Sequence, residues 1–291
     1  MNLSNSLSAA LYCSLLLILL STGFTVPSKE EHWQALFNGR DLSGWDTYLG
    51  PALRNDGKPV TEKPQGLNND PQKVFTVVRL QDENVIRISG QSWGAITSKK
   101  EYKNYHLQLQ FKWGELTWAP RKNQAKDSGL LYHCVGSHGA DASAWMRSQE
   151  FQIAEKDCGD YWGVAGGSAD IPAIKRSEGN YTYDPQGTLT TFREDRKESR
   201  HCAKKGNAEN PAGEWNTLDL YCHGDTSIHV VNGKVMMVLY NNKQIDKGEA
   251  TTLDKGKIQI QSEGAEVFYK KIRIRSITQL PAELLKQRSE P

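Results

Sequence analysis

Between Tyr105 and Trp113 the sequence alternates strictly between apolar and polar residues, and this pattern constrains the fold most strongly. The odd positions hold apolar or aromatic side chains: Tyr105, Leu107, Leu109, Phe111 and Trp113. The even positions hold polar ones: His106, Gln108, Gln110 and Lys112. Because successive side chains of a strand point to opposite faces, the odd set is predicted against a core and the even set on a solvated face.

Several shorter segments also have strand character and are separated by turn signals. They are residues 74–79, 85–89, 130–134, 188–192, 257–261 and 267–277. Residues 226–240 predict a hairpin, because Asn232-Gly233 suits a two-residue turn with positive φ at both positions. Only residues 280–286 predict a helix, a short one near the end. Many short strands with turns between them favour a β-sandwich or a barrel.

The rest of the chain is consistent with one globular domain. Two long segments, 49–73 and 194–213, are expected to be loops of that domain and not linkers between two. Hydrophobic residues make up 37% of the chain, enough for a sizeable core. The net charge of +2 gives no strong field that would indicate nucleic acid or an anionic membrane. Motifs of P-loops, dinucleotide sites, serine nucleophile elbows and HExxH zinc helices are absent.

The first residues predict a signal for export. No charged side chain precedes Lys29, and the apolar run 15–20 is followed by small and polar residues from Ser21 onward. This run is shorter than the roughly 20 residues of a membrane-spanning helix, which favours a cleaved signal peptide over an anchor. We therefore expect a signal peptide over residues 1–25 and a secreted or periplasmic domain over 26–291, with no membrane contact after cleavage.

The cysteines leave two interpretations open. Those that follow the predicted signal peptide are Cys134, Cys158, Cys202 and Cys222. An even number in an exported protein allows two disulfides. Buried free thiols are an equally good interpretation, since most cysteines are simply buried. The irregular spacing does not match a zinc site.

The polar stretch 148–160, SQEFQIAEKDCGD, is the main candidate for a functional site. Phe151 and Ile153 alternate with Glu150 and Gln152, which predicts a strand with the two polar side chains opposite the core. A carboxylate and an amide side by side can transfer a proton and hold a hydroxyl-rich ligand. From spacing alone, a solvated strand face followed by an acidic turn is the favoured alternative.

Aromatic residues around this stretch favour a carbohydrate ligand. Trp145, Tyr161 and Trp162 flank it, and sugar rings have apolar faces that stack on such side chains. Any one of these residues, taken alone, is more typical of a core. Glycosidase chemistry of the usual kind needs two acids at a fixed separation. The sequence offers three partners for Glu150: Glu155, Asp157 and Glu263.

Two further polar groups are candidates. The first, at residues 127–133, contains Asp127 and His133. His133 is a possible general base because the ordinary pKa of histidine lies near neutrality, although a structural histidine inside the sandwich is the favoured alternative. The second group includes Gln261 and Glu263, which are expected on the polar face of the strand 257–261 and just beyond it.

Short blocks recur in one order along the chain. They are 36–45 (LFNGRDLSGW), 127–130 (DSGL), 150–153 (EFQI), 213–216 (GEWN), 231–233 (VNG) and 258–261 (IQIQ). Each block is short, but their order and spacing together are specific. Through them the chain resembles the 3-keto-disaccharide hydrolase domain family, of the concanavalin A-like lectin/glucanase superfamily, over almost all of its predicted mature length.

This resemblance implies an all-β fold, a concanavalin-like jelly-roll β-sandwich of two antiparallel sheets with a concave sugar-binding sheet. It also implies a hydrolase or lyase that cleaves 3-keto-glycosides or 3-keto-disaccharides formed by a partner sugar 3-dehydrogenase. Glu150 matches the family's characteristic glutamate, which implies a role as acid/base, with His133 as a second catalytic candidate. The expected substrate-binding residues are Gln152, Asp127, Glu155, Trp145, Trp162 and Gln261.

The chain also departs from the commonest family pattern, which indicates a divergent branch. The departures are Asp127 for asparagine, His133 for arginine, Glu155 for aspartate and Glu263 for histidine. The additional acid at position 127 also suits a divalent cation, with Glu150 and His133 as co-ligands. Two alternatives to an enzyme of 3-keto sugars stay open: a lectin-like glycan-binding module and a classical glycoside hydrolase with paired carboxylates.

Overall fold

The computed structural model describes residues 32–286, which form two large antiparallel β-sheets and one short helix, α1 (Ala282–Lys286). The 12-stranded sheet has as its main path β13 (Asn180–Tyr183), β12 (Gly167–Ser177), β18 (Lys234–Asp246), β17 (Thr226–Val231), β16 (Asn216–His223), β8 (Tyr105–Thr117), β21 (Ala265–Ser276), β5 (Glu83–Ile88) and β4 (Phe75–Leu80). Pairing beside this path are β1 (Gln34–Ala35) with β21, β14 (Thr188–Phe192) with β12, and β19 (Glu249–Thr252) with β18.

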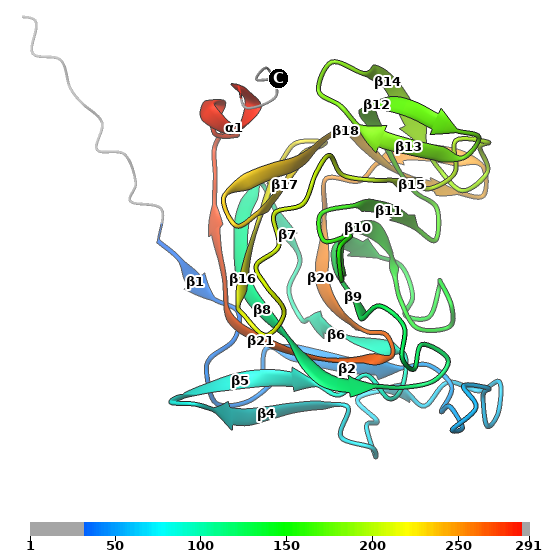
Figure 1. Cartoon of the computed structure of the whole chain (residues 1–291), viewed down its shortest axis with the longest axis vertical. Coiled ribbons are helices and arrows are strands. Elements are labelled where there is room, and N and C mark those ends of the chain that lie inside the picture. Colours follow the sequence, from blue (N-terminus) through cyan, green and yellow to red (C-terminus); the bar gives the residue numbers. More distant parts are fainter. Residues whose placement is uncertain (1–31, 287–291) are drawn as a thin grey trace, which may run out of the picture. The chain divides into compact units, whose positions relative to one another are not determined.

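The second sheet has nine strands and carries the candidate site. In order they are β15 (His201–Cys202), β11 (Tyr161–Val164), β10 (Arg147–Ala154), β9 (Asp127–Val135), β20 (Lys255–Ser262), β6 (Gly94–Ser98), β2 (Trp45–Leu49) and β3 (Gly66–Leu67), with β7 (Tyr102–Lys103) paired to β20. Figure 1 shows β8, β16 and β21 in one layer and β9, β10 and β20 in the facing layer. The predicted all-β, jelly-roll sandwich of two antiparallel sheets is confirmed.

The main core lies between the two sheets and follows from strand alternation. Leu107, Leu109 and Phe111 of β8 pack in one cluster with Phe151 of β10 and Ile260 of β20, and all are fully buried. Burying side chains of this size from both layers is the dominant favourable contribution to folding, at roughly 25 cal/mol per Å² of apolar surface. The predicted burial of the odd positions of 105–113 is therefore confirmed.

One even position of that strand departs from the prediction. His106 was expected on a solvated face, but only 4% of it is exposed. Its ring stacks on Tyr221 with centroids 3.9 Å apart and lies 4.7 Å from Trp33. Its Nε2 is 2.7 Å from Oδ1 of Asp219, so the buried imidazole keeps a polar partner. Aromatic neighbours on the outer face cover this side chain, which the alternation pattern could not predict.

The other predicted elements are found within a few residues. The hairpin between β17 and β18 turns at Asn232 (φ 48°) and Gly233 (φ 79°), as expected. The segment 49–73 contains only the short strand β3 after the end of β2. The segment 194–213 was expected to be a loop, but it contributes β15, an edge strand of the second sheet. Strands that were not predicted, besides β15, are β1, β2, β3, β6, β7, β11, β12, β13, β16 and β19.

All four cysteines among the described residues are buried free thiols, so the disulfide interpretation is wrong and the free-thiol interpretation is right. They are spread over separate apolar clusters: Cys134 packs near Trp145, Cys202 near Phe192, and Cys158 and Cys222 in the main core. Burial raises the pKa of each thiol well above its ordinary value, which keeps these sulfurs protonated and unreactive.

The predicted signal peptide, residues 1–25, lies outside the described residues. Within residues 32–286, no helix is long and apolar enough to cross a membrane.

Candidate active site

A pocket of about 430 Å³ lies on the second sheet, on the side away from the main core. Strands β9, β10, β11 and β20 supply its floor, and the segment that carries β15 supplies one wall. Its aromatic lining consists of Trp145 and Trp162. Its polar and charged lining consists of Arg121, Asp127, Asp141, Glu150, Gln152, Asp157, Asp160, Arg200, His201, Gln261 and Glu263. A concave site with this volume and so many polar groups suits a small hydroxyl-rich ligand.

Glu150 lies at the floor of the pocket because of the period of strand β10. Phe151 and Ile153 are fully buried in the core, and Glu150 and Gln152 therefore point to the opposite face, as predicted. Only 6% of Glu150 is exposed, so its side chain does not lie on a solvated face. Burial, and then the nearby charge of Glu263, raise the pKa of Glu150 well above its ordinary value. Within residues 32–286, no donor is hydrogen-bonded to its carboxylate.

Gly129 makes room for this carboxylate. It is the register partner of Gln152 across the β9–β10 pair, and it lies beneath both Glu150 and Gln261. A Cβ at position 129 would overlap Oε1 of Glu150 and Oε1 of Gln261. The glycine is therefore required by close approach of side chains, because its backbone has an ordinary strand conformation.

Two more acids lie beside Glu150, one buried (Asp127) and one partly buried (Glu263). Asp127, which is 4% exposed, forms an ion pair with Nη2 of Arg121, and Nη1 of the same guanidinium is 3.4 Å from Oε1 of Glu263. Burial raises the pKa of Asp127 to about 6, although Arg121 acts against this shift. Burial and the charge of Asp127 raise the pKa of Glu263 well above its ordinary value. Three carboxyl groups in one pocket can therefore exchange protons much closer to neutrality than ordinary acids.

Several polar atoms of the pocket are buried and lack hydrogen-bond partners among the described residues. They are Nε of Arg121, Oδ1 of Asp127, Oε1 of Gln152 and Oε1 of Gln261. Buried polar atoms are nearly always paired in folded proteins, so a group of unpaired ones in one cavity indicates a ligand that completes them. Both donors and acceptors are present, which matches the hydroxyl groups of a sugar.

The opposite wall of the pocket comes from the segment that was expected to be a loop. The carbonyl oxygen of Arg200 accepts a hydrogen bond of 2.8 Å from the backbone of Gly163, which holds this segment against β11. Nη1 of Arg200 donates to Oδ2 of Asp141 at 2.6 Å. The ring of His201 stacks on Trp162, with centroids 4.4 Å apart. Sequence reasoning missed Arg121, Asp141, Arg200 and His201; for Arg200 and His201 the one signal was the charge density of the segment 194–213.

Trp145 and Trp162 both line the pocket, as do Gln152, Asp127 and Gln261. The two tryptophans differ in their packing. Trp145 is 7% exposed, its Nε1 donates to the carbonyl oxygen of Gly94 at 3.0 Å, and its ring stacks on Trp93. Trp162 is only partly buried. The structure therefore places Trp145 as a rigid wall and Trp162 as the more accessible aromatic surface.

His133 and Glu155 do not line the pocket. His133 is fully buried on the core side between Tyr105 and Tyr132, and its Nδ1 lies 2.9 Å from the carbonyl oxygen of Leu253. Burial lowers its pKa to about 4. Its catalytic role is therefore not supported, because the positive φ of 53° and the register shift in β9 turn it away from the site.

Glu155 lies just beyond β10 and is paired with Lys126. Its Oε2 accepts a hydrogen bond of 3.1 Å from the backbone nitrogen of Lys126, and its Oε1 lies 3.5 Å from the ammonium group. This carboxylate fixes the entry to β9 and does not face the cavity, so the expected role in substrate binding is corrected. Strand β10 ends at Ala154, and the turn that follows carries Glu155 toward Lys126.

The expected cation site does not form. Within the described part of the chain, no group of three or more His, Cys, Asp and Glu side chains is arranged to hold a metal ion. His133 is on the other side of the sheet from the pocket, and Asp127 is already paired with Arg121. The three residues proposed as co-ligands therefore do not fit a common ion.

Comparisons with known proteins identify the family. The model of the 3-keto-alpha-glucoside-1,2-lyase-like domain matches residues 32–275. A search of curated proteins finds no matching relative. Among solved structures, two candidate glycosyl hydrolases from Parabacteroides distasonis are 17% and 18% identical, with TM-scores of 0.44 and 0.47. Both cover 84% of this chain, which spans 94% and 100% of theirs.

A carbohydrate-binding module from Bacillus subtilis, CBM66, is 8% identical, with a TM-score of 0.40, over 69% of this chain and 92% of the module. The family match and the pocket define a β-sandwich protein with a carbohydrate-related role. More particularly, because the family model spans most of its length, the chain belongs to the 3-keto-alpha-glucoside-1,2-lyase-like domain family.

Proposed function

We propose that the protein cleaves glycosides whose sugar carries a ketone at carbon 3, by elimination across carbons 1 and 2 followed by addition of water. The observation that carries the proposal is Glu150, a buried carboxyl group with a raised pKa at the floor of its pocket. In the same pocket Nε of Arg121, Oε1 of Gln152 and Oε1 of Gln261 lack partners among the described residues. A raised pKa brings the carboxyl group close to the pH at which it can both accept and donate a proton. Membership of the family supports the choice of a 3-keto sugar.

In this mechanism Glu150 acts as the base at carbon 2. A ketone at carbon 3 acidifies the hydrogen on carbon 2, so one buried carboxylate is sufficient to remove it. The enolate oxygen needs a donor, and the unpaired Nε of Arg121 and the amide of Gln152 are the donors in the pocket that could supply it. Gln261 and Trp162 would hold the hydroxyl groups and an apolar sugar face.

The substrate must be oxidised before it reaches this site. Nothing in the proposed steps makes the ketone, so a sugar 3-dehydrogenase is the class of partner enzyme that must act first. We further propose that the domain works after export, as a secreted or periplasmic protein, on the basis of the apolar run at residues 15–20. Amino-terminal sequencing of protein recovered outside the cytoplasm tests this, since an uncleaved chain retained inside the cell would contradict it.

A classical glycoside hydrolase is a second candidate, and one observation favours it. Glu263 lines the same pocket as Glu150 and raises the pKa of that residue by its charge, so two acids are available at one site. Such a pair would act on sugars that were never oxidised. A glycan-binding module would use the same aromatic and amide groups without turnover.

One experiment separates these functions. Matched glycosides with and without the 3-keto group are offered to the protein, and release of the aglycone is followed. Turnover of the keto form alone is the expected result. Turnover of both forms would support the classical hydrolase, and binding without turnover of either would support a lectin-like module. Each of these two outcomes would overturn the proposal.

A further inference from the structure

We propose that His201 is a second proton-transfer residue, which protonates the oxygen that leaves carbon 1 and then activates the water that replaces it. This inference rests on the proposed function, and it assigns a role to a segment in which sequence reasoning found no site.

His201, Trp162 and Glu150 form one row across three strands. Glu150 is the register partner of Trp162 across β10 and β11, and Trp162 is the partner of His201 across β11 and β15. Directly opposite residues of antiparallel strands have their side chains on the same face. With neighbouring strands about 4.8 Å apart, the backbones at Glu150 and His201 lie about 10 Å apart. The two groups therefore enter the same pocket from its floor and its wall.

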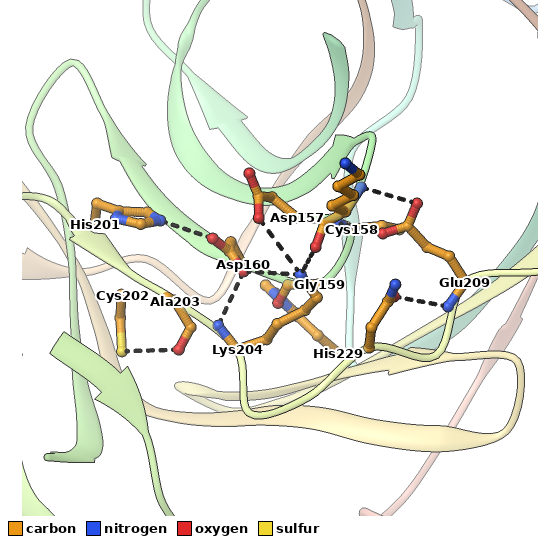
Figure 2. Close-up of polar contacts among 12 residues, drawn as sticks. Asp157, Cys158, Gly159, Asp160, His201, Cys202, Ala203, Lys204, Glu209 and His229 are labelled. Atoms are coloured by element: carbon orange, nitrogen blue, oxygen red, sulfur yellow. Dashed lines mark hydrogen bonds and ion pairs between the residues drawn. The ribbon is translucent and has the colours of Figure 1, made fainter. Parts of the chain in front are cut away.

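Asp160 fixes the imidazole and decides which nitrogen can exchange a proton. Nε2 of His201 lies 2.8 Å from Oδ2 of Asp160, which is 3% exposed (Figure 2). Oδ1 of Asp160 accepts a hydrogen bond of 2.9 Å from the backbone nitrogen of Lys204. Both oxygens of Asp160 act as acceptors in this arrangement, so we place the proton of the His201–Asp160 hydrogen bond on Nε2. Nε2 is engaged with Asp160 and His201 lines the pocket, so we assign Nδ1 as the nitrogen that meets the substrate.

Lys204 is a positioning residue for this pair. Its side chain is 5% exposed, and its ammonium nitrogen lies 3.7 Å from Oδ1 of Asp160 and 3.8 Å from Oδ1 of Asp157. Figure 2 shows Asp160 between His201 and Lys204. This contact holds the Asp160 side chain in place, and the hydrogen bond between Nε2 and Asp160 in turn holds the imidazole in one orientation.

Two proton-transfer groups, Glu150 and His201, are sufficient for the elimination and for the addition of water. Glu150 takes the proton from carbon 2, and the electron pair forms the enolate of the carbon-3 ketone. The enolate re-forms the ketone, a double bond forms between carbons 1 and 2, and the bond from carbon 1 to the leaving oxygen breaks. Protonated His201 gives its Nδ1 proton to that oxygen. Neutral His201 then takes a proton from water as it adds to carbon 1, and Glu150 returns the proton to carbon 2.

The test uses a His201→Gln variant of the full chain, because the glutamine amide can still donate to Asp160 but cannot exchange a proton. Two 3-keto glycosides are compared: a 4-nitrophenyl glycoside, whose leaving group needs no protonation, and a methyl glycoside, whose leaving group needs it. We expect the variant to lose about 100-fold in kcat/KM on the methyl substrate and to stay within about threefold of the wild type on the nitrophenyl substrate.

Hydrogen exchange at carbon 2 in D2O is a second readout, since it reports the step assigned to Glu150. The His201→Gln variant is expected to keep this exchange, whereas removal of Glu150 abolishes it. A His138→Gln variant is the matched control, because that histidine stacks on Tyr48 outside the pocket. This variant should leave kcat/KM unchanged on both substrates.

Equal losses on both substrates, or no loss on either, would overturn the role of His201. Absence of turnover of any 3-keto glycoside by the wild-type protein would instead overturn the proposed function. The two failures are therefore distinguishable.

Discussion

The α-carbon of Gly129 lies directly beneath the carboxylate of Glu150, on the neighbouring strand of the same sheet. The space above this glycine is filled by Oε1 of Glu150 and by the amide oxygen of Gln261. Position 129 therefore determines where the proposed base can lie, although glycine has no side chain that could take part in the reaction.

Replacing this glycine is expected to displace the base. A Gly129→Ala substitution should lower kcat/KM at least tenfold and cost about 1–3 kcal/mol in the free energy of unfolding, because the added methyl group overpacks a buried contact. Kinetics on a 3-keto glycoside and denaturant unfolding measure the two effects. In the Glu150→Gln background the same substitution should cause little further loss of activity, and fully additive losses would argue against a shared cause.

Removing the charge of the base is expected to abolish activity without unfolding the protein. Glu150→Gln should reduce kcat by at least about 100-fold, the usual contribution of a general base. Because burial disfavours the ionised form of this carboxyl group, the variant should be as stable as the wild type or more so above neutral pH. Retention of full activity in a variant with unchanged melting behaviour would contradict the role given to Glu150.

The buried acids are expected to make stability fall as pH rises. In the folded protein the pKa of Asp127 rises from 3.8 to about 6, so between these values the folded state binds more protons than the unfolded chain. The resulting cost is absent below about pH 4 and reaches about 3 kcal/mol above about pH 6. Glu263, whose pKa is also raised, adds to this effect. Unfolding measured from pH 4 to 8 should be less pH-dependent in Glu263→Gln than in the wild type.

Arg121 is expected to be essential for holding two of these acids in place. Arg121→Ala leaves Asp127 buried without its ion-pair partner, which should lower the free energy of unfolding by about 3 kcal/mol. This value is at the low end for a buried ion pair, because the arginine side chain is 30% exposed. Arg121→Lys keeps the charge but not the fork of donors, so it should recover stability better than activity. Thermal unfolding and steady-state kinetics of both variants provide the comparison, and equal recovery of both properties would argue against a donor role.

The two tryptophans are expected to respond differently to truncation. Trp162→Ala should raise KM several-fold to about tenfold through loss of an aromatic surface for the sugar, with a small effect on stability. Trp145→Ala should mainly reduce stability, by about 3–5 kcal/mol, because that indole is buried against Trp93. Calorimetry and kinetics on both variants distinguish these cases. The reverse pattern would contradict the assignment of Trp162 as the ligand surface.

Much of the fold could be predicted because strand alternation is a local property. The period of two in residues 105–113 and around Glu150 decides which side chains face the core, and both patterns hold in the structure. Strand β6 could not be found this way, because its five residues are all buried and show no alternation. Asn232-Gly233 predicted its turn because the requirement for positive φ is set within two residues.

The site was only partly predictable. Glu150 and Gln152 were found because they lie on one strand, whereas Arg121 and His201 reach the pocket from distant segments whose sequences carry no period. His133 and Glu155 were misplaced for a related reason. A register shift in β9 ends the alternation that would place His133 on the pocket face, and Glu155 lies in the turn after β10, where it pairs with Lys126.

The sequence by itself determined the family, the all-β class and the face on which Glu150 lies, since each depends on residue order along short stretches. Only the tertiary structure decided that Asp127, Glu150 and Glu263 share one buried pocket, and that Arg121 and the His201–Asp160 pair face it. The physical reason is that pairing between strands brings together residues far apart in the chain. The raised pKa values of these acids then depend on burial and on neighbouring charges, which residue order does not specify.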